Sequence, residues 1–512
     1  MSIPNIKKFM VAQRVSHRYS VSVATTGLRG VANLLAAALL ARWLGPESYG
    51  VMAYLVAILI ALRNLIDFSV TSAFFTFISK QEFSLRFFVR YWTWILTQFA
   101  VCFVALSVVI PDKLLHILMP EIDRTLLLIA MTAVFFHSQV WQNISNMAEA
   151  RRLTILSQTI NTMVVILHLL VLYVLWLTDA LILHWIFLAM CFEWAIASVL
   201  LTFVLKHKRK QDSHLIYQDY DNFRDQVSKF WTYCAPYIPY TIIGPICVFL
   251  DRWFLQTWSG PEQQANFAVA QQLSLISLLL TTSLLKIFWK EVAELHHNQD
   301  YSKLKSFYDA TIRRLYFVGC CFFCLVIPWS TEILLLFFGE KYLSGVLVFA
   351  VMLFYPVHQS LGQIMITVLH ATEKSKLQVS LGIFFMVSGL FFAYFVIAPK
   401  SNSVPGLNLG ALGLALKLVI IQLLQINIMG WFLCRSLNWK FDWFYQIAYL
   451  PILVLLAFFT KYVFFQLIGF SLIISMILSG LVFSILVLLI AFSFPNIIAS
   501  TRKDLKRFVN LA

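Results

Sequence analysis

The sequence predicts an all-α polytopic membrane protein with about 14 transmembrane helices. Two six-helix lobes in a parallel repeat surround a central cavity, and two further helices follow at the C-terminus. Hydrophobic residues make up 60% of the 512 residues and charged residues 12%, against about 45–50% and about 25% in typical soluble domains. So few charges cannot cover the surface of a soluble protein of this length. This composition excludes a soluble enzyme, a disordered chain and a disulfide scaffold.

The apolar stretches give the number of helices, because crossing a bilayer core of ~30 Å takes about 20 helical residues. Six of them lie near residues 20–43, 49–68, 87–110, 125–147, 153–177 and 180–205. Six more lie near 230–255, 266–288, 312–337, 343–370, 377–398 and 408–434, and the last two near 447–465 and 471–492. Each predicts a membrane-spanning helix.

The basic residues give the orientation of these helices. With the N-terminus in the cytoplasm, 29 of the 39 Lys and Arg residues fall on cytoplasmic segments and 7 on the opposite side. Positive charge resists translocation, so the bias predicts a multi-pass protein of the cell inner (cytoplasmic) membrane with both termini in the cytoplasm. It also accounts for the net charge of +15 without nucleic acid as a partner. The long first span, which carries Arg29, predicts that no signal peptide is cleaved.

These patterns divide the chain into six segments. We expect a cytoplasmic amphipathic N-terminus at 1–19, an N-lobe of helices 1–6 at 20–205, a cytoplasmic linker at 206–229, a C-lobe of helices 7–12 at 230–434, helices 13–14 at 435–496, and a basic cytoplasmic tail at 497–512.

The two predicted lobes share a motif where their first helices end. Residues 41–55 read ARWLGPESYGVMAYL, and residues 251–270 read DRWFLQTWSGPEQQANFAVA. In both, Arg-Trp is followed by Gly-Pro-Glu, in which Gly-Pro interrupts the helix and Glu suits the start of the next one. The recurrence indicates a duplication, and six helices per lobe give both copies the same orientation.

These stretches resemble polysaccharide exporters of the MOP superfamily, which include the Wzx-type flippases of O-antigen, capsule and exopolysaccharide repeat units. The segments 251–270 and VPGLNLGALGLALKL (404–418) resemble the second half of the same family. The resemblance implies two six-helix lobes around a V-shaped cavity. The lipid II flippase is a related branch, but its Ser-Arg…Gly…Arg-Asp/Glu pattern is missing from GLRGVANLL (27–35), which favours the polysaccharide branch.

Charged residues inside the spans are the candidate substrate-binding residues, because a charge at a helix centre costs roughly 2.5–3.5 kcal/mol on insertion scales. Arg29, Arg63 and Lys417 are the three basic ones. A polyprenyl-diphosphate glycan carries phosphates through an apolar layer, and fixed cations in a water-filled cavity offset their desolvation. Structural alternatives stay open: a self-neutralising Arg63–Asp67 pair, backbone anchoring by Arg29, and packing with snorkelling for Lys417.

Two acidic residues inside spans, Glu193 and Asp67, are the candidates for coupling transport to an ion gradient, with a counter-ion role as the alternative. Amide and imidazole side chains are the candidate glycan contacts, with bonds between helices as the alternative. They are His137, Gln142, Asn146, Gln359 and Gln363.

The sequence thus predicts a non-enzymatic flippase that moves undecaprenyl-diphosphate-linked oligosaccharide units to the outer leaflet by alternating access, for cell-surface polysaccharides such as lipopolysaccharide. Its expected partners are the lipid-linked oligosaccharide, membrane lipids, a polysaccharide polymerase and a chain-length regulator. The cysteines lack metal-ligand spacing, so we expect no metal and no cofactor. The alternatives are a cation-coupled drug exporter of the same superfamily and a membrane-embedded polymerase or glycosyltransferase, although the short outer loops argue against an enzyme.

Overall fold

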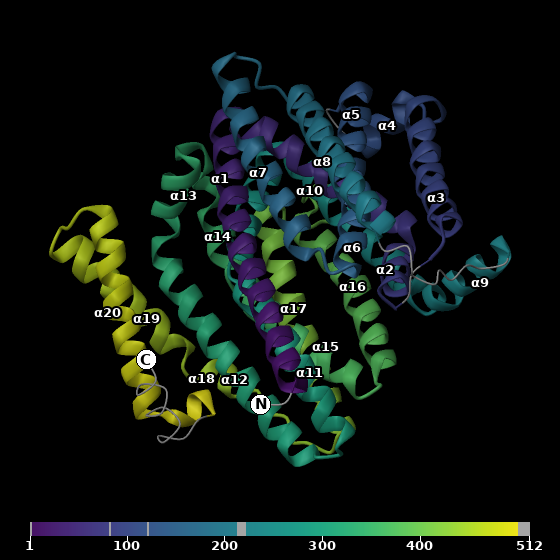
Figure 1. Ribbon diagram of the computed structural model, residues 1–512. Coiled ribbons are helices and arrows are strands. Elements are labelled where there is room, and N and C mark those ends of the chain that lie inside the picture. Colours follow the sequence, from purple (N-terminus) through teal and green to yellow (C-terminus); the bar gives the residue numbers. More distant parts are fainter. Residues whose placement is uncertain (1–2, 81–82, 120–121, 212–221, 500–512) are drawn as a thin grey trace. The chain divides into compact units, whose positions relative to one another are not determined.

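The computed structural model describes residues 3–80, 83–119, 122–211 and 222–499, which form helices and no strand (Figure 1). This confirms the predicted all-α membrane fold. Residues 212–221 of the predicted linker and 500–512 of the predicted tail lie outside the described residues. The chain divides into two compact units, Met1–Ala265 and Asn266–Ala512, whereas the predicted segment boundaries at 205 and 230 stay a prediction.

Unit 1 consists of helices that follow one another through short turns. They are α1 (Ile3–Asp67), α2 (Val70–Lys80), α3 (Leu85–Val104), η1 (Ala105–Val109), α4 (Asp112–Leu118), α5 (Arg124–Phe135), η2 (Phe136–Trp141), α6 (Gln142–Ala150), α7 (Thr154–Leu177), α8 (Leu183–Gln211), α9 (Phe223–Cys234) and η3 (Ala235–Tyr237). Helix α10 (Ile238–Leu275) begins in unit 1 and ends in unit 2.

Unit 2 continues with the remaining helices. They are α11 (Leu278–His297), α12 (Tyr301–Val326), η4 (Ile327–Trp329), α13 (Ser330–Phe338), η5 (Glu340–Gly345), α14 (Val346–Met352), α15 (Phe354–Ala371), α16 (Ser375–Ile397), α17 (Gly410–Ser436), α18 (Tyr445–Ala448), α19 (Leu450–Lys461), η6 (Tyr462–Leu467), α20 (Leu472–Ser493) and η7 (Pro495–Ile498).

The described residues contain 12 helical segments that are long and apolar enough to cross a membrane. Two of them, Thr25–Asp67 with 43 residues and Phe223–Leu275 with 53, are about twice the length that one crossing takes. Each is interrupted by the glycine of a Gly-Pro-Glu motif, Gly45 with φ 76° and Gly260 with φ 83°. The first segment is long enough for two crossings, and the second crossing of the other segment continues past Leu275 into α11, which agrees with the fourteen predicted from the sequence.

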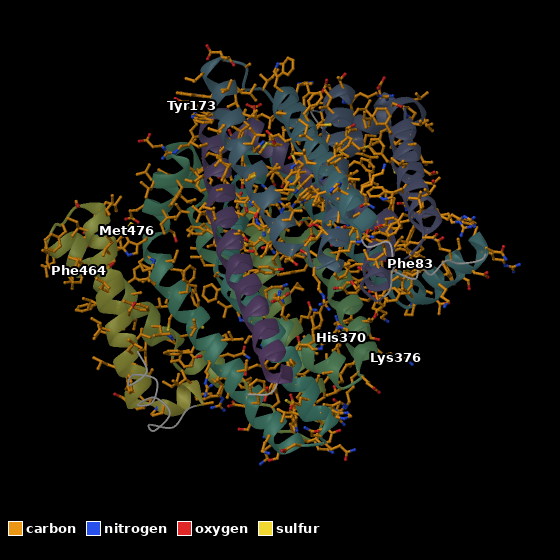
Figure 2. All side chains as sticks on the ribbon, in the orientation of Figure 1. Phe83, Tyr173, His370, Lys376, Phe464 and Met476 are labelled. Carbon is orange, nitrogen blue, oxygen red and sulfur yellow. The ribbon has the colours of Figure 1, made fainter. Side chains whose placement is uncertain are left out.

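Helix α7 packs alongside α1 in unit 1 (Figure 1). Trp43 of α1 stacks on Trp176 of α7 with ring centroids 5.2 Å apart, and Tyr173 stacks on the same indole at 6.0 Å. Figure 2 places Tyr173 near the end of α7. Offset aromatic pairs at this spacing stabilise a contact beyond the area that they bury, so the cluster holds α1 and α7 together at this end.

In unit 2, α15 is the most enclosed helix and packs against α11, α12 and α17. A short turn follows it, so that His370 of α15 and Lys376 of α16 lie at adjoining helix ends (Figure 2). Helices α19 and α20 form a pair (Figure 1), and α19 is fixed to the rest of the unit by Lys461, whose ammonium donates to Glu332 and to the Pro328 carbonyl.

The two Gly-Pro-Glu turns lie against each other. A Cβ placed on Gly50, one turn after the first motif, would lie 1.9 Å from the carbonyl oxygen of Pro261 in the second. The neighbour is backbone and cannot rotate away, so the contact requires a glycine. The duplicated motif thus makes both a helix interruption and a close helix–helix contact.

We predict that Gly50→Ala destabilises the protein by about 1–3 kcal/mol, the usual cost of overpacking a close contact. Gly27→Ala in the same helix is the matched control, because no atom lies within 4 Å of a Cβ built there. Replacing a helical glycine by alanine at such an open position stabilises by up to about 1 kcal/mol. Thermal unfolding of both variants in detergent should therefore shift in opposite directions, and equal shifts would contradict the close contact.

Candidate functional site

Arg63 of α1 has an acceptor on each of its three guanidinium nitrogens. Nε donates to Oε1 of Gln139, Nη1 to Oδ1 of Asn64 at 2.8 Å, and Nη2 to Oγ1 of Thr71 at 3.2 Å. Nη2 also lies 3.9 Å from Oδ1 of Asp67. The predicted Arg63–Asp67 pair is therefore present, as part of a larger hydrogen-bond network.

Asp67 is buried at the turn between α1 and α2, where Phe68 and Ser69 have positive φ angles and end the helix. Its carboxylate accepts from the backbone N–H of Thr71 at 3.3 Å and from the Thr71 hydroxyl at 2.5 Å. A carboxylate in this position satisfies donors at the start of α2. Asp67 thus neutralises Arg63 and caps the next helix.

The network continues through buried amides to α3 and α6. Tyr91 donates its hydroxyl to Oδ1 of Asn143 at 2.7 Å, and Nδ2 of Asn143 donates to the Gln139 carbonyl at 2.8 Å. Asn143 is fully buried, so each of these groups needs its partner. The arrangement joins α1, α2, α3, η2 and α6 into one polar core.

Arg29, earlier on α1, has a different environment. Its side chain is half-buried and donates through Nη2 to Oγ1 of Thr26 at 3.3 Å. Glu149, a carboxylate on α6, interacts with it electrostatically. A guanidinium has five N–H donors, and the described contacts of Arg29 leave most of them for another acceptor.

Helix α6, which carries Glu149, has a strip of polar side chains. Gln142, Asn146 and Glu149 are spaced by four and three residues, which places them on one face of the helix. Gln142 and Glu149 are exposed, Asn146 is half-buried, and Gln142 donates to Asn146 at 3.2 Å. Two predicted glycan contacts therefore lie on the helix whose Glu149 interacts electrostatically with Arg29.

Glu193 lies on α8 and pairs with His168 of α7, whose Nδ1 is 2.8 Å from Oε2 of Glu193. His137, a predicted glycan contact, lies on the π-helical turn η2 with its ring 4.5 Å from that of Trp194. His137 therefore contacts an aromatic side chain of α8.

Three predicted site residues belong to unit 2. Lys417 is buried on α17, where a Cβ built on Gly389 of α16 would lie 3.1 Å from its Cε atom. Gln359 and Gln363 are half-buried and one turn apart on α15. Among the described residues, Oε1 of Gln363 is buried without a hydrogen-bond partner.

Sequence reasoning did not select the residues that complete these clusters. Gln139, Thr71 and His168 each bond a predicted site residue. His168 was detectable, because it is an ionisable residue within an apolar span. Gln139 and Thr71 were not, because amides and hydroxyls are common inside membrane helices and nothing in the sequence relates them to Arg63.

A model of the polysaccharide biosynthesis protein family matches residues 19–287, which is more than half of the chain. The chain belongs to this family. A search of curated proteins finds no match.

Solved structures share the fold at low sequence identity. The lipid II flippase MurJ in its inward closed conformation is 15% identical, with a TM-score of 0.67 over 93% of this chain and 99% of MurJ. A MOP superfamily transporter from Pyrococcus furiosus is 12% identical, with a TM-score of 0.58 over 82% of this chain and 94% of that one. A multidrug resistance MATE transporter in its inward-facing conformation is 12% identical, with a TM-score of 0.52 over 82% and 95%. The predicted resemblance to a polysaccharide biosynthesis family is confirmed, and the fold is shared with these three transporters.

We predict that Asp67→Asn lowers the free energy of unfolding by about 3–5 kcal/mol, the usual cost of removing one partner of a buried ion pair. The double variant Arg63→Met/Asp67→Leu should recover much of this loss, because it leaves no buried charge. Thermal or denaturant unfolding of Arg63→Met, Asp67→Leu and the double variant closes the cycle and measures the coupling. Additive losses would show that Arg63 and Asp67 do not act as a pair.

Proposed function

We propose that this protein flips undecaprenyl-diphosphate-linked oligosaccharide units from the cytoplasmic to the outer leaflet by alternating access. The products would enter cell-surface polysaccharides such as lipopolysaccharide O-antigen, with a polymerase and a chain-length regulator as partners. Membership of the polysaccharide biosynthesis family and the fold shared with the lipid II flippase MurJ support this proposal. The observation that carries it is the environment of Arg29.

Arg29 is suited to bind a phosphate of the lipid-linked glycan. It is half-buried within a membrane-spanning helix and keeps donors unused by its described contacts. It also interacts electrostatically with Glu149, which shares one face of α6 with Gln142 and Asn146. Arginine stays charged and binds phosphate oxygens bidentately. The amides of Gln142 and Asn146 would then accept and donate hydrogen bonds to sugar hydroxyls next to the diphosphate.

The other basic candidates take different parts in this proposal. Arg63 has its donors engaged within unit 1, so we assign it to holding the helices that present Arg29 and α6. Lys417 of unit 2 remains a proposed phosphate-binding residue. Gln359 and Gln363 remain proposed glycan contacts. Of the two coupling candidates, Asp67 caps α2 and neutralises Arg63, which leaves Glu193 for ion exchange.

We predict that Arg29→Ala abolishes export of the polysaccharide while the protein is still made and inserted. Arg29→Lys should retain only part of the export, because a point charge replaces the bidentate guanidinium. The test measures lipid-linked glycans and surface polysaccharide in a deletion strain complemented with each variant, and thereby reports how much export each variant supports. Arg86→Ala is the matched control, because Arg86 is an exposed residue on α3.

Glu149→Gln separates phosphate binding from a merely structural ion pair. If Arg29 serves the substrate, removing the Glu149 charge leaves export intact, whereas a structural pair would make Glu149→Gln as damaging as Arg29→Ala. Full export by Arg29→Ala would remove the main residue of the proposal. Preferential binding of cationic drugs that is lost in Glu149→Gln would instead support a drug exporter.

The charge bias of the loops predicts that Lys305 is cytoplasmic and Lys341 lies outside. Single cysteines at these positions in a cysteine-free variant should react with a membrane-impermeant maleimide at 341 in intact cells, and at 305 only after permeabilisation. Labelling of position 305 in intact cells would overturn the proposed inner-membrane topology and the direction of transport.

A further inference from the structure

His168 and Glu193 form a buried ionisable pair inside unit 1. Nδ1 of His168 lies 2.8 Å from Oε2 of Glu193, and the two side chains are 19% and 6% exposed. Both residues lie in the middle of apolar membrane-spanning helices, α7 and α8. Ionisable residues at such positions are costly and face a partner or a pathway, and this pair uses each residue as the other's partner.

The carboxylate of Glu193 is only half satisfied. Among the described residues, its second oxygen, Oε1, is buried and has no hydrogen-bond partner. The positions one turn from His168 and Glu193 on their own helices, Val164 and Ala197, belong to a buried apolar cluster with Trp141 and Trp194. An ionised carboxylate with one free oxygen is unfavourable in such surroundings, and a bound proton removes this cost.

His137 is the other titratable group that interacts with the pair. It lies on η2, which packs against α8, and interacts electrostatically with His168. The charged groups with described side chains on the other elements packed against α7 and α8 are Arg29, Arg42, Glu47, Arg63 and Asp67 on α1, Arg124 on α5, and Glu149 on α6. Of these, Arg29 interacts with Glu149, Arg63 with Asp67, and Arg124 with Asp112 outside this set.

The contrast with Asp67 shows which acid can exchange a proton. Asp67 lies 3.9 Å from the permanent charge of Arg63 and accepts two hydrogen bonds from Thr71, so its carboxylate already has a cation and two donors as partners. Glu193 faces an imidazole, whose own charge depends on a proton near neutral pH. The His168–Glu193 pair can therefore hold one proton as a neutral unit, and it becomes a buried anion when that proton leaves.

We propose that His168 and Glu193 together bind one exchangeable proton, and that this proton is the ion that couples transport to the membrane gradient. The coupling part of the proposal rests on the proposed flippase function. The pair takes up a proton from one aqueous side and releases the same proton to the other, with no bond made or broken besides N–H and O–H. Sodium is disfavoured because hard cations prefer several oxygen ligands, whereas one carboxylate oxygen is occupied here by an imidazole nitrogen.

Helix α7 provides the connection to Arg29. Gln158 of α7 accepts a hydrogen bond from Thr25 of α1 at 2.9 Å, about one turn before Arg29. His168 lies ten residues further along α7, about 15 Å at the rise of an α-helix. Helix α7 thus carries His168 of the proposed proton-binding pair and also contacts the segment of α1 that carries Arg29, the proposed phosphate-binding residue.

Proton binding can be measured without the transported substrate. Purified full-length protein in weakly buffered detergent is titrated between about pH 5 and pH 8, the range in which imidazole groups exchange protons. The variants are Glu193→Gln, His168→Gln and the double variant. Since the protons of a coupled pair belong to both residues, each single variant should lose about one bound proton per chain and the double variant no more.

An exposed pair in the same unit is the matched control. Nε2 of His184 lies 3.5 Å from Oδ2 of Asp123, with side chains 40% and 55% exposed. Asp123→Asn should leave the number of protons exchanged in this range unchanged, because an exposed carboxyl titrates below it. A lower number of exchanged protons in Glu193→Gln, but not in Asp123→Asn, therefore distinguishes the buried pair from the exposed one.

The outcomes separate the two proposals. Superimposable titrations of wild type and Glu193→Gln, or a double variant that loses two protons, would overturn the proton pair. If Glu193→Gln does not fold, Glu193→Asp retains the carboxylate, and the pair then predicts that proton uptake is retained. Normal surface polysaccharide in a deletion strain, with the titration as expected, would reject the flippase but keep the proton site.

Discussion

The cost of placing charge inside an apolar helix bundle governs how unit 1 is built. Two ionisable pairs lie within its helices: Arg63 with Asp67, and His168 with Glu193. Each pair connects different helices or successive helical segments, so neutralising the charge also fixes the helices relative to one another. In this unit, the contacts that neutralise buried charges also hold the helices together. Breaking one charged pair therefore disturbs the packing of the helices that it connects.

The π-helical turn η2 has a central place in this arrangement. Gln139 of η2 accepts from Arg63, and two residues earlier His137 contacts Trp194 and interacts with His168. A regular α-helix would place residues two apart on nearly opposite faces, and π-helical turns occur frequently at functional sites. One short distortion between α5 and α6 therefore touches both the Arg63 network and the proton pair. If protonation alters the packing of α7 and α8, this turn is the element that would transmit the change.

The number of helices and the repeat could be predicted because they depend on properties that a sequence carries locally. Apolar length marks each crossing, and Gly-Pro-Glu marks both interruptions, where Gly45 and Gly260 adopt positive φ angles. The partners of the charged residues could not be predicted. Glu149 is 120 residues from Arg29, and its proximity depends on how α6 packs. The close approach of Gly50 to Pro261 could not be predicted either, because it depends on how segments far apart in the sequence pack. Both residues nevertheless lie in the stretches that carry the repeated motif.

The fraction of hydrogen-bonding groups that already have partners distinguishes structural from functional charged residues here better than their burial does. Glu193 is more buried than Arg29, yet both retain unused hydrogen-bonding capacity, whereas the Arg63–Asp67 pair is occupied on every guanidinium nitrogen. A saturated charge would have to lose existing bonds to bind anything new, and its partners would be left buried without compensation. An unsaturated charge gains bonds when a ligand or a proton arrives. By this criterion, Arg29 suits the anionic ligand and Glu193 the proton that we propose, while Arg63 and Asp67 hold helices of the same unit together.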